Sequence, residues 1–112
     1  MVPGSSGTLS PSFSEASGSY LNIRQLGNIV YLAGVVKAES SFGGSLGTFT
    51  GVDAPLRITE IPVLSHNGNP ETVDDYHQGE IVVVEALGTK QIATNIASGD
   101  TVIIINGFYF TA

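Results

Sequence analysis

The sequence predicts an all-β fold, a compact antiparallel β-barrel or sandwich with almost no helix. Runs of β-branched and aromatic residues recur about every ten residues, and Gly, Asn, Asp and Ser separate them. No window of about 11 residues combines helical periodicity with capping signals. The 112 residues are enough for one domain. We expect a flexible Gly- and Ser-rich entry segment over 1–18, with at most a short edge strand at 8–13, and one barrel domain over 19–112.

The first regular strands are expected directly after the entry segment. Residues 20–25 alternate apolar and polar side chains, which is typical of a half-buried strand, and 29–36 is apolar on both faces. The two segments should pair as a hairpin across a short Gly-Asn turn. Further strands are expected at 48–50 and 56–61, and Pro62 should end the second or confine it to a sheet edge.

The last third of the chain has the strongest strand signal. Its three apolar runs are Ile81–Val84, Val102–Ile105 and Phe108–Phe110. Asn106-Gly107 lies between the last two runs and predicts a tight hairpin turn. The runs do not alternate apolar with polar residues, so both faces of these strands should be dry. One face can line the core, and we expect another copy of the chain to cover the other. A two-layer sandwich core rich in Ile and Val is the alternative.

Composition excludes several classes of protein. The net charge is −6 and only four residues are Lys or Arg, so binding to a nucleic-acid backbone is not expected. Charged residues make up only 12% of the chain, which again favours buried contacts between subunits. Without Cys there is no disulfide or Cys-based metal site. No apolar run is long enough to span a membrane, and no secretory signal is expected in residues 1–7.

Two motifs in the chain look catalytic or metal-binding at first sight. Residues 43–47 match G-x-S-x-G, but that nucleophile motif needs a following helix, so we expect an ordinary loop. His66 and His77 fit no zinc or iron ligand spacing. Asp74 and Asp75 do not form a calcium loop of the EF-hand type. We therefore predict no metal, no cofactor and no enzymatic activity.

The polar segment 65–80 favours weak sugar recognition. Sugar hydroxyls bind planar polar side chains, and a ring packs against the face of the sugar. Such sites usually lie on loops that a rigid scaffold holds. The candidate saccharide-binding residues are Asp74, Asp75, Tyr76, His77, Arg57 and His66, with Asn67 and Asn69 beside them.

Two stretches resemble the head domains of phage receptor-binding proteins and tail-fibre tips, notably of phages of Gram-positive dairy bacteria. In those heads a basic residue and a Gly-Asn pair precede an apolar strand that ends near a Gly. The residues that match here are Arg24, Gly27, Asn28, Val30, Leu32 and Gly34. The ending 103–110 is similar to the closing hairpin of such heads.

The resemblance implies a β-barrel head that forms a homotrimer behind a Gly-rich linker and a stalk, at the tail tip or baseplate of a virion. It also implies binding of host cell-wall saccharide, through contacts that map here onto Asp74, Asp75, His77 and Arg57. The pocket Trp that the family often uses is missing. The partners to expect are therefore the saccharide, further copies of the chain, and stalk or baseplate proteins. A structural virion domain without a ligand and a small cell-wall glycan hydrolase are the alternatives.

Overall fold

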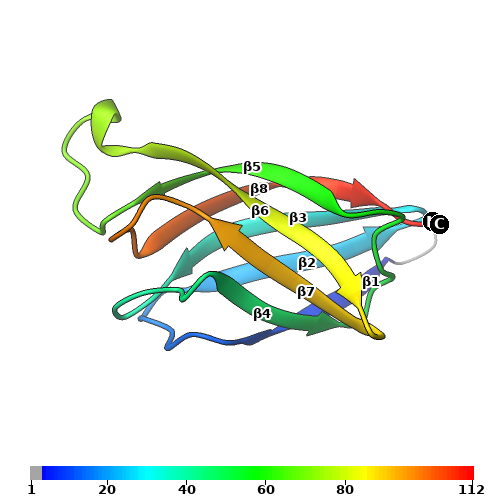
Figure 1. Ribbon diagram of the computed structural model, residues 1–112. Helices are drawn as coiled ribbons and strands as arrows, with labels where there is room; N and C mark the ends of the chain where they lie inside the picture. The colour runs from blue at the N-terminus through cyan, green and yellow to red at the C-terminus, as the bar shows by residue number, and fades with distance from the viewer. Residues whose placement is uncertain (1–3) are drawn as a thin grey trace.

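The computed structural model describes residues 4–112, which form eight antiparallel strands closed into one barrel (Figure 1). The strands are β1 (Ser5–Pro11), β2 (Tyr20–Leu26), β3 (Ile29–Lys37), β4 (Ser45–Thr50), β5 (Thr59–His66), β6 (His77–Ala86), β7 (Thr89–Asn95) and β8 (Val102–Phe110). Around the barrel they follow the order β1-β2-β3-β8-β5-β6-β7-β4. The only helix among the described residues is the 3-10 turn η1 (Val73–Asp75). The predicted all-β barrel with almost no helix is confirmed.

Alternating side chains fill the inside of the barrel. Along β3, for example, Val30, Leu32 and Val36 are buried, whereas Tyr31 and Ala33 between them are exposed. Successive side chains of a strand point to opposite faces, so each strand contributes every second residue to the core. The largest fully buried side chains are Tyr109, Phe49, Ile23, Leu32, Leu46, Ile81, Ile92, Ile103 and Ile105. The interior is therefore packed with side chains.

The N-terminal segment closes the barrel. Residues 1–18 were expected as a flexible entry with at most a short edge strand at 8–13. Ser5–Pro11 is instead strand β1 of the barrel, which pairs with both β2 and β4. Two unpaired sheet edges would otherwise remain, and β1 satisfies both. The sequence indicated at most an edge strand here, because the segment is rich in Gly and Ser and only Leu9 carries a large apolar side chain. Residues 1–3 of the predicted segment lie outside the described part of the chain.

Strand β8 runs straight through the predicted turn. Asn106 pairs with Ala33 and Gly107 with Leu32, so the hairpin expected at Asn106-Gly107 is wrong. Gly107 has a packing role instead, because a Cβ atom there would lie only 2.4 Å from Cγ2 of Ile61. The tight turn with two left-handed residues occurs at Leu87 (φ 54°) and Gly88 (φ 79°), between β6 and β7.

Strand β5 is displaced from its expected position. It covers Thr59–His66 rather than 56–61, and Pro62 lies inside it. The carbonyl of His66 accepts a hydrogen bond from the N–H of Thr101, so the backbone polar groups of His66 point toward β8. These groups alternate in direction along a strand, so those of Leu64 and Pro62 point the same way. Pro62 has no N–H to donate on that side. Pairing of β5 with β8 is accordingly confined to Leu64–His66, while pairing with β6 continues along the whole strand.

Two further strands differ from the expectation in extent. The strand expected at 48–50 is longer and begins at Ser45. Strand β7 was not expected, because Ile92 is its one fully buried residue and the rest of its sequence is polar or small. It is held by its neighbours, since it pairs with β4 on one side and β6 on the other. The hairpin of β2 and β3 is as predicted.

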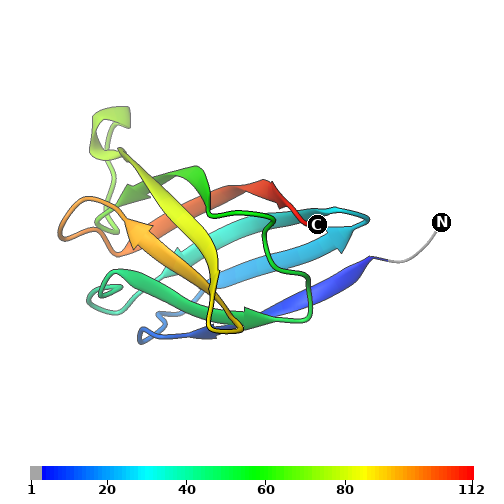
Figure 2. The same cartoon turned by 45° about the vertical axis from the view of Figure 1, so that its right-hand side comes forward.

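The barrel has two ends with different loops. We call the end formed by residues 12–19, 38–44, 67–76 and 96–101 the polar rim, and the other end the opposite rim. The 3-10 turn projects from the polar rim, whereas the C-terminus lies at the opposite rim (Figure 2). No helix within residues 4–112 is long and apolar enough to cross a membrane.

The contact between Gly107 and Ile61 can be tested by mutation. Gly107→Ala should lower the free energy of unfolding by about 1–3 kcal/mol, because the added methyl group overlaps the Ile61 side chain. Adding Ile61→Ala removes the overlapping atom, so the double variant should be more stable than the sum of the single effects predicts. Urea unfolding measures all three, and Asn106→Ala on the exposed side of β8 is the control. Additive effects of the two substitutions would contradict a continuous β8.

Candidate functional site at the polar rim

The polar rim is the acidic end of the molecule. Its loops hold six of the ten carboxylates, namely Glu15, Glu39, Glu71, Asp74, Asp75 and Asp100. The same loops contain no Lys or Arg, although Lys37 ends β3 at their border. The rim should therefore repel anionic ligands and accept hydrogen bonds from neutral or cationic ones.

The structure brings His66 and Tyr76 together at this rim. Their rings meet edge to face with centroids 5.2 Å apart. The backbone N–H of Gly68 donates to Nδ1 of His66 at 3.0 Å, so the neutral ring carries its proton on Nε2. Tyr76 is 36% exposed. The pair thus offers an aromatic surface and an N–H donor at the end of β5.

His77 belongs to a second group, with Ser65 and Asp100. Oδ2 of Asp100 accepts hydrogen bonds from Oγ of Ser65 at 2.6 Å and from Nδ1 of His77 at 2.7 Å. Ser65 and Asp100 are buried, whereas the side chain of His77 is 47% exposed. With Nδ1 bound to the carboxylate, neutral His77 presents Nε2 as an acceptor.

This group is not a catalytic triad. In a triad the imidazole lies between the serine and the carboxylate, so that it can take the hydroxyl proton. Here the carboxylate lies between the other two side chains, and Ser65 is fully buried. The arrangement ties the loop before β8 to β5 and β6, because Asp100 comes from the 96–101 loop.

Asp74 and Asp75 occupy different environments, although they are neighbours in η1. Oδ2 of Asp75 accepts the backbone N–H groups of Glu71 at 2.8 Å and Thr72 at 3.0 Å. These two hydrogen bonds, Glu71 first, lower the pKa of the Asp75 carboxyl below its usual value. Asp75 thus shapes the turn, whereas Asp74 is exposed and forms no side-chain hydrogen bond within residues 4–112.

The remaining predicted residues are divided between the two ends. Asn67 accepts the N–H of Asn69 in a local turn at the polar rim. Arg57 precedes β5, so the length of that strand, roughly 25 Å, separates it from the polar rim. The structure therefore does not bring Arg57 to the other candidates. The G-x-S-x-G match begins in a loop, and Ser45 opens β4, where its hydroxyl donates to the carbonyl of Ile92.

Sequence reasoning missed Asp100 and Ser65. Asp100 follows Gly99 in a stretch that reads as turn material, and Ser65 was the border of a polar loop. Nothing in the order of residues connects positions 35 apart. Both could be found only from the pairing of β5 with β6 and β8, which places Ser65 opposite His77 and Ile103.

Beside Asp100 the polar rim is hollowed. A cavity of about 260 Å³ lies between residues 41–44 and 94–100. This volume is slightly below the roughly 300 Å³ at which small-molecule pockets usually begin. Within residues 4–112, no three His, Asp or Glu side chains gather where they could hold a metal ion. The rim is therefore suited to shallow contacts of hydrogen bonds and ring packing.

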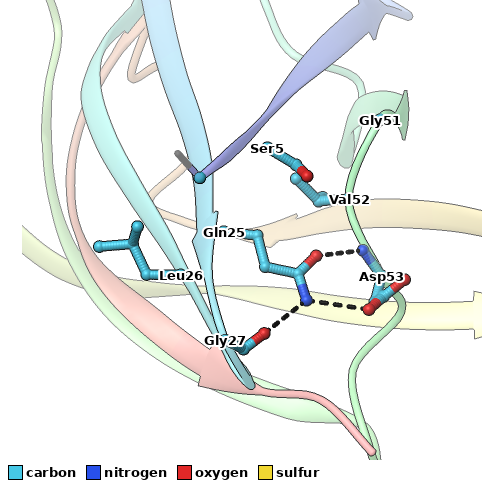
Figure 3. A pocket seen from close by; sticks show the side chains of 8 residues that line it. Ser5, Gln25, Leu26, Gly27, Gly51, Val52 and Asp53 are labelled. Carbon is cyan, nitrogen blue, oxygen red and sulfur yellow. Dashed lines mark hydrogen bonds between the residues drawn. The ribbon is translucent and has the colours of Figure 1, made fainter. Parts of the chain in front are cut away.

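The opposite rim has a larger hollow of about 470 Å³, but its Gln25 and Asp53 side chains are bonded to each other (Figure 3). Nε2 of Gln25 donates to the Gly27 carbonyl and to Oδ2 of Asp53, and Oε1 accepts the Asp53 N–H at 2.8 Å. The hydroxyl of Tyr109 donates to the Asp53 carbonyl at 2.6 Å. These bonds fasten the segment between β4 and β5 across the barrel end, so we interpret this hollow as structural.

The Asp100 group gives a stability prediction. Asp100→Ala should cost about 1–3 kcal/mol of unfolding free energy, because it leaves the buried Ser65 hydroxyl without an acceptor. The loss should be smaller in Asp100→Ala/Ser65→Ala, where both partners are gone. Asp74→Ala is the exposed control and should change stability by less than about 0.5 kcal/mol. Equal effects of Asp100→Ala and Asp74→Ala in urea unfolding would contradict a stabilising role of the Asp100 hydrogen bonds.

Tyr109 gives a pH prediction. Burial, and to a lesser degree the charge of Asp53, raises the pKa of Tyr109 above its usual value of 10. The folded state holds this proton more tightly, so stability from this group is present below about pH 10 and falls as the pH rises above it. At about pH 11, the folded wild type and Tyr109→Phe should show equal tyrosinate absorbance. After unfolding, the wild type should exceed the variant by one tyrosinate, and an excess already in the folded state would contradict the prediction.

Comparison with known proteins gives no match for this chain: no family model, no curated protein and no solved structure matches it.

Proposed function

We propose that the chain is a saccharide-binding β-barrel domain that contacts cell-surface glycan through its polar rim. The observation that carries the proposal is the contact between the rings of His66 and Tyr76, whose centroids lie 5.2 Å apart. The two rings lie on a rim of exposed polar side chains. Loops on a rigid scaffold are common positions for binding sites, and the closed barrel supplies that scaffold. The proposal extends to recognition only and includes no enzymatic step.

Donors and acceptors at the rim are complementary to sugar hydroxyls. A hydroxyl group both donates and accepts hydrogen bonds. His66 offers an N–H at Nε2, His77 offers an acceptor at Nε2, and Asp74 offers carboxylate oxygens. Tyr76 adds a ring face for the apolar C–H side of a sugar. Arg57 has no part in this site, since it lies at the opposite rim.

The charge of the rim narrows the class of saccharide. Six carboxylates without a neighbouring Lys or Arg in the same loops disfavour phosphate- or carboxylate-bearing polymers. Neutral sugars and amino sugars are the chemistries that fit. A single saccharide bound on this shallow rim should therefore have a low affinity.

The biological setting that we propose follows the resemblance to phage receptor-binding heads. In that setting the domain is one subunit of a homotrimer at a virion tail tip or baseplate, attached to stalk proteins, and it binds host cell-wall saccharide during adsorption. Linking several weak sites can raise the overall avidity by about 10²–10⁴. No step of this setting depends on a metal or a cofactor.

A purely structural virion or assembly domain is the second candidate. The observation that favours it is the exposed apolar surface on β8, where Phe108 and Phe110 are 49% and 52% exposed. Such a surface indicates protein contacts rather than a sugar site. A small cell-wall glycan hydrolase with a carboxylate pair is less favoured, because Asp75 and Asp100 at the rim already accept hydrogen bonds from the protein itself.

The proposal can be tested on a glycan array followed by calorimetry with the best neutral ligand. Tyr76→Ala and His66→Ala should each weaken binding about three- to tenfold, because each removes part of the ring surface. Arg57→Ala is the matched control, an exposed residue at the opposite rim, and should bind like the wild type. The affinity should also change little with added salt, since the ligand is uncharged.

Two outcomes would refute the saccharide proposal. One is that the wild type binds no glycan of the array, even when the glycan is present at millimolar concentration. The other is binding that Arg57→Ala weakens as much as Tyr76→Ala does. Either result would leave the structural candidate as the better interpretation.

A further inference from the structure

The outer surface around β8 carries large exposed apolar side chains. We call this surface the apolar face, and its residues are Tyr31, Leu56, Ile58, Leu64, Phe108 and Phe110, each 41–66% exposed. Four of them are connected by contacts: Phe108 packs against Tyr31 at 6.2 Å and Phe110 at 5.5 Å between ring centroids, and the Leu56 N–H donates to the Phe110 carbonyl. Ile58 lies two residues after Leu56, and Leu64 lies opposite Ile104, further along β8. The apolar face therefore spans β3, β8, β5 and the segment that leads into β5.

The size of the apolar face approaches that of a subunit contact. An aromatic side chain presents roughly 150–250 Å² when fully exposed. At half exposure the three rings leave on the order of 300 Å², and the three aliphatic side chains add to this, so the face lies within the roughly 300–600 Å² range of the largest patches on monomers. A standard protein interface buries about 800 Å² per partner. With its polar margins included, the apolar face is large enough for a stable contact.

Charges of opposite sign flank the apolar face. On the β2 side, Arg24 lies beside Tyr31, its register partner, and Tyr31 in turn pairs with Phe108. Arg57 borders the face at its opposite-rim end, beside Leu56 and Phe108, and on the β5 side lie Glu60 and Glu80. Both are outward-facing residues, since their strand neighbours Ile61 and Ile81 are buried.

The two flanks lie at the same height on the barrel. From the pair Leu64–Ile104, four residues back along β5 and four forward along β8 bring Glu60 level with Phe108. Arg24 is level with the same residue through Tyr31. A row across the sheet therefore has a cation at one end, two aromatic rings in the middle and a carboxylate at the other end.

Neither flank finds its counter-ion within one copy. Within residues 4–112 the one contact between a basic side chain and a carboxylate is His77–Asp100, so Arg24, Glu60 and Glu80 have no opposite charge in contact. Glu60 and Glu80 are close enough that a shared hydrogen bond and their mutual repulsion raise the pKa of Glu60. Glu80 also accepts a hydrogen bond from Asn95 at 3.2 Å, which holds it in place.

We propose that the apolar face is the contact between copies of this chain, with Arg24 of one copy against Glu60 and Glu80 of the next. Each copy carries a net charge of −6, so copies repel one another unless the contact surface matches charges or lacks them. The apolar face does both. The inference deepens the proposed function, on which it rests, because it supplies the multivalency that weak sugar sites need.

The shape of the barrel favours a ring over a face-to-face pair. The outside of a barrel curves away from any flat partner, so two copies would touch along one stripe. Copies around a common axis bury both flanks, because the Arg24 side of each meets the carboxylate side of the next. Such a head-to-tail contact closes into a ring when the rotation between neighbouring copies divides a full turn. A groove of about 530 Å³ beside Leu64 and Ile104 leaves room for a neighbour's apolar side chain.

Charge reversal tests the contact by sedimentation without saccharide. Arg24→Glu and the double variant Glu60→Lys/Glu80→Lys should each weaken association about a hundredfold, because they place like charges opposite one another. Combining all three substitutions in one chain exchanges the charges and should restore association. Glu39→Lys, an exposed carboxylate at the polar rim, is the control for the change in net charge and should associate like the wild type.

Three results would overturn the proposal: a wild type that is monomeric at micromolar concentration, reversals without effect, or a triple variant that stays dissociated. Mixing Arg24→Glu with Glu60→Lys/Glu80→Lys distinguishes a ring of three from a twofold dimer. In a twofold dimer of one copy of each variant, every contact joins opposite charges. In a ring of three, two copies of the same variant must meet, and that contact joins like charges. Recovery as heterodimers would refute the ring. Saccharide affinity of a dissociated variant is measured separately, so failure of the contact and failure of the sugar site can be told apart.

Discussion

Closure of the barrel by β1 is the constraint on which the rest of the structure depends. This strand joins β2 to β4, and without it both would end as open sheet edges. The approach is close at Gly47, where φ is 128° and a Cβ atom would lie 2.1 Å from the Ser10 carbonyl oxygen. A side chain there would push β1 away from β4. Closure in turn fixes the positions of the loops at both ends.

A filled interior moves all chemistry to the surface. Tyr109 and Phe49 pack within 6.4 Å of each other inside the barrel, and Ile, Leu and Val side chains occupy the rest. No ligand can enter along the barrel axis. The opposite rim is closed by bonds of Gln25 and Tyr109 to the β4–β5 segment. The proposed recognition is therefore placed at the polar rim, and the proposed assembly at the outer face of β8.

These two surfaces have complementary physical properties. The polar rim concentrates carboxylates and ring nitrogens, which keep it hydrated and favour weak, reversible contacts with polar ligands. The apolar face carries rings and aliphatic side chains bordered by unmatched charges, which suit the proposed contact with another copy of the chain. Because the two surfaces lie on different parts of the barrel, the proposed association would leave the polar rims accessible.

The sequence by itself determined the fold class, because β-branched runs at short intervals without helical periodicity leave few alternatives. It also placed the hairpin of β2 and β3, and it singled out His66 and Tyr76, whose rings meet in the structure.

Only the tertiary structure decided the rest. Asn106-Gly107 has the local chemistry of a turn, but pairing with β3 along nine residues holds it in a strand. Ser5–Pro11 and β7 have weak intrinsic signals, and their neighbours on both sides impose the conformation. Arg57 left the candidate site, and Asp100 joined it, because strand register rather than residue type decides which loops share an end.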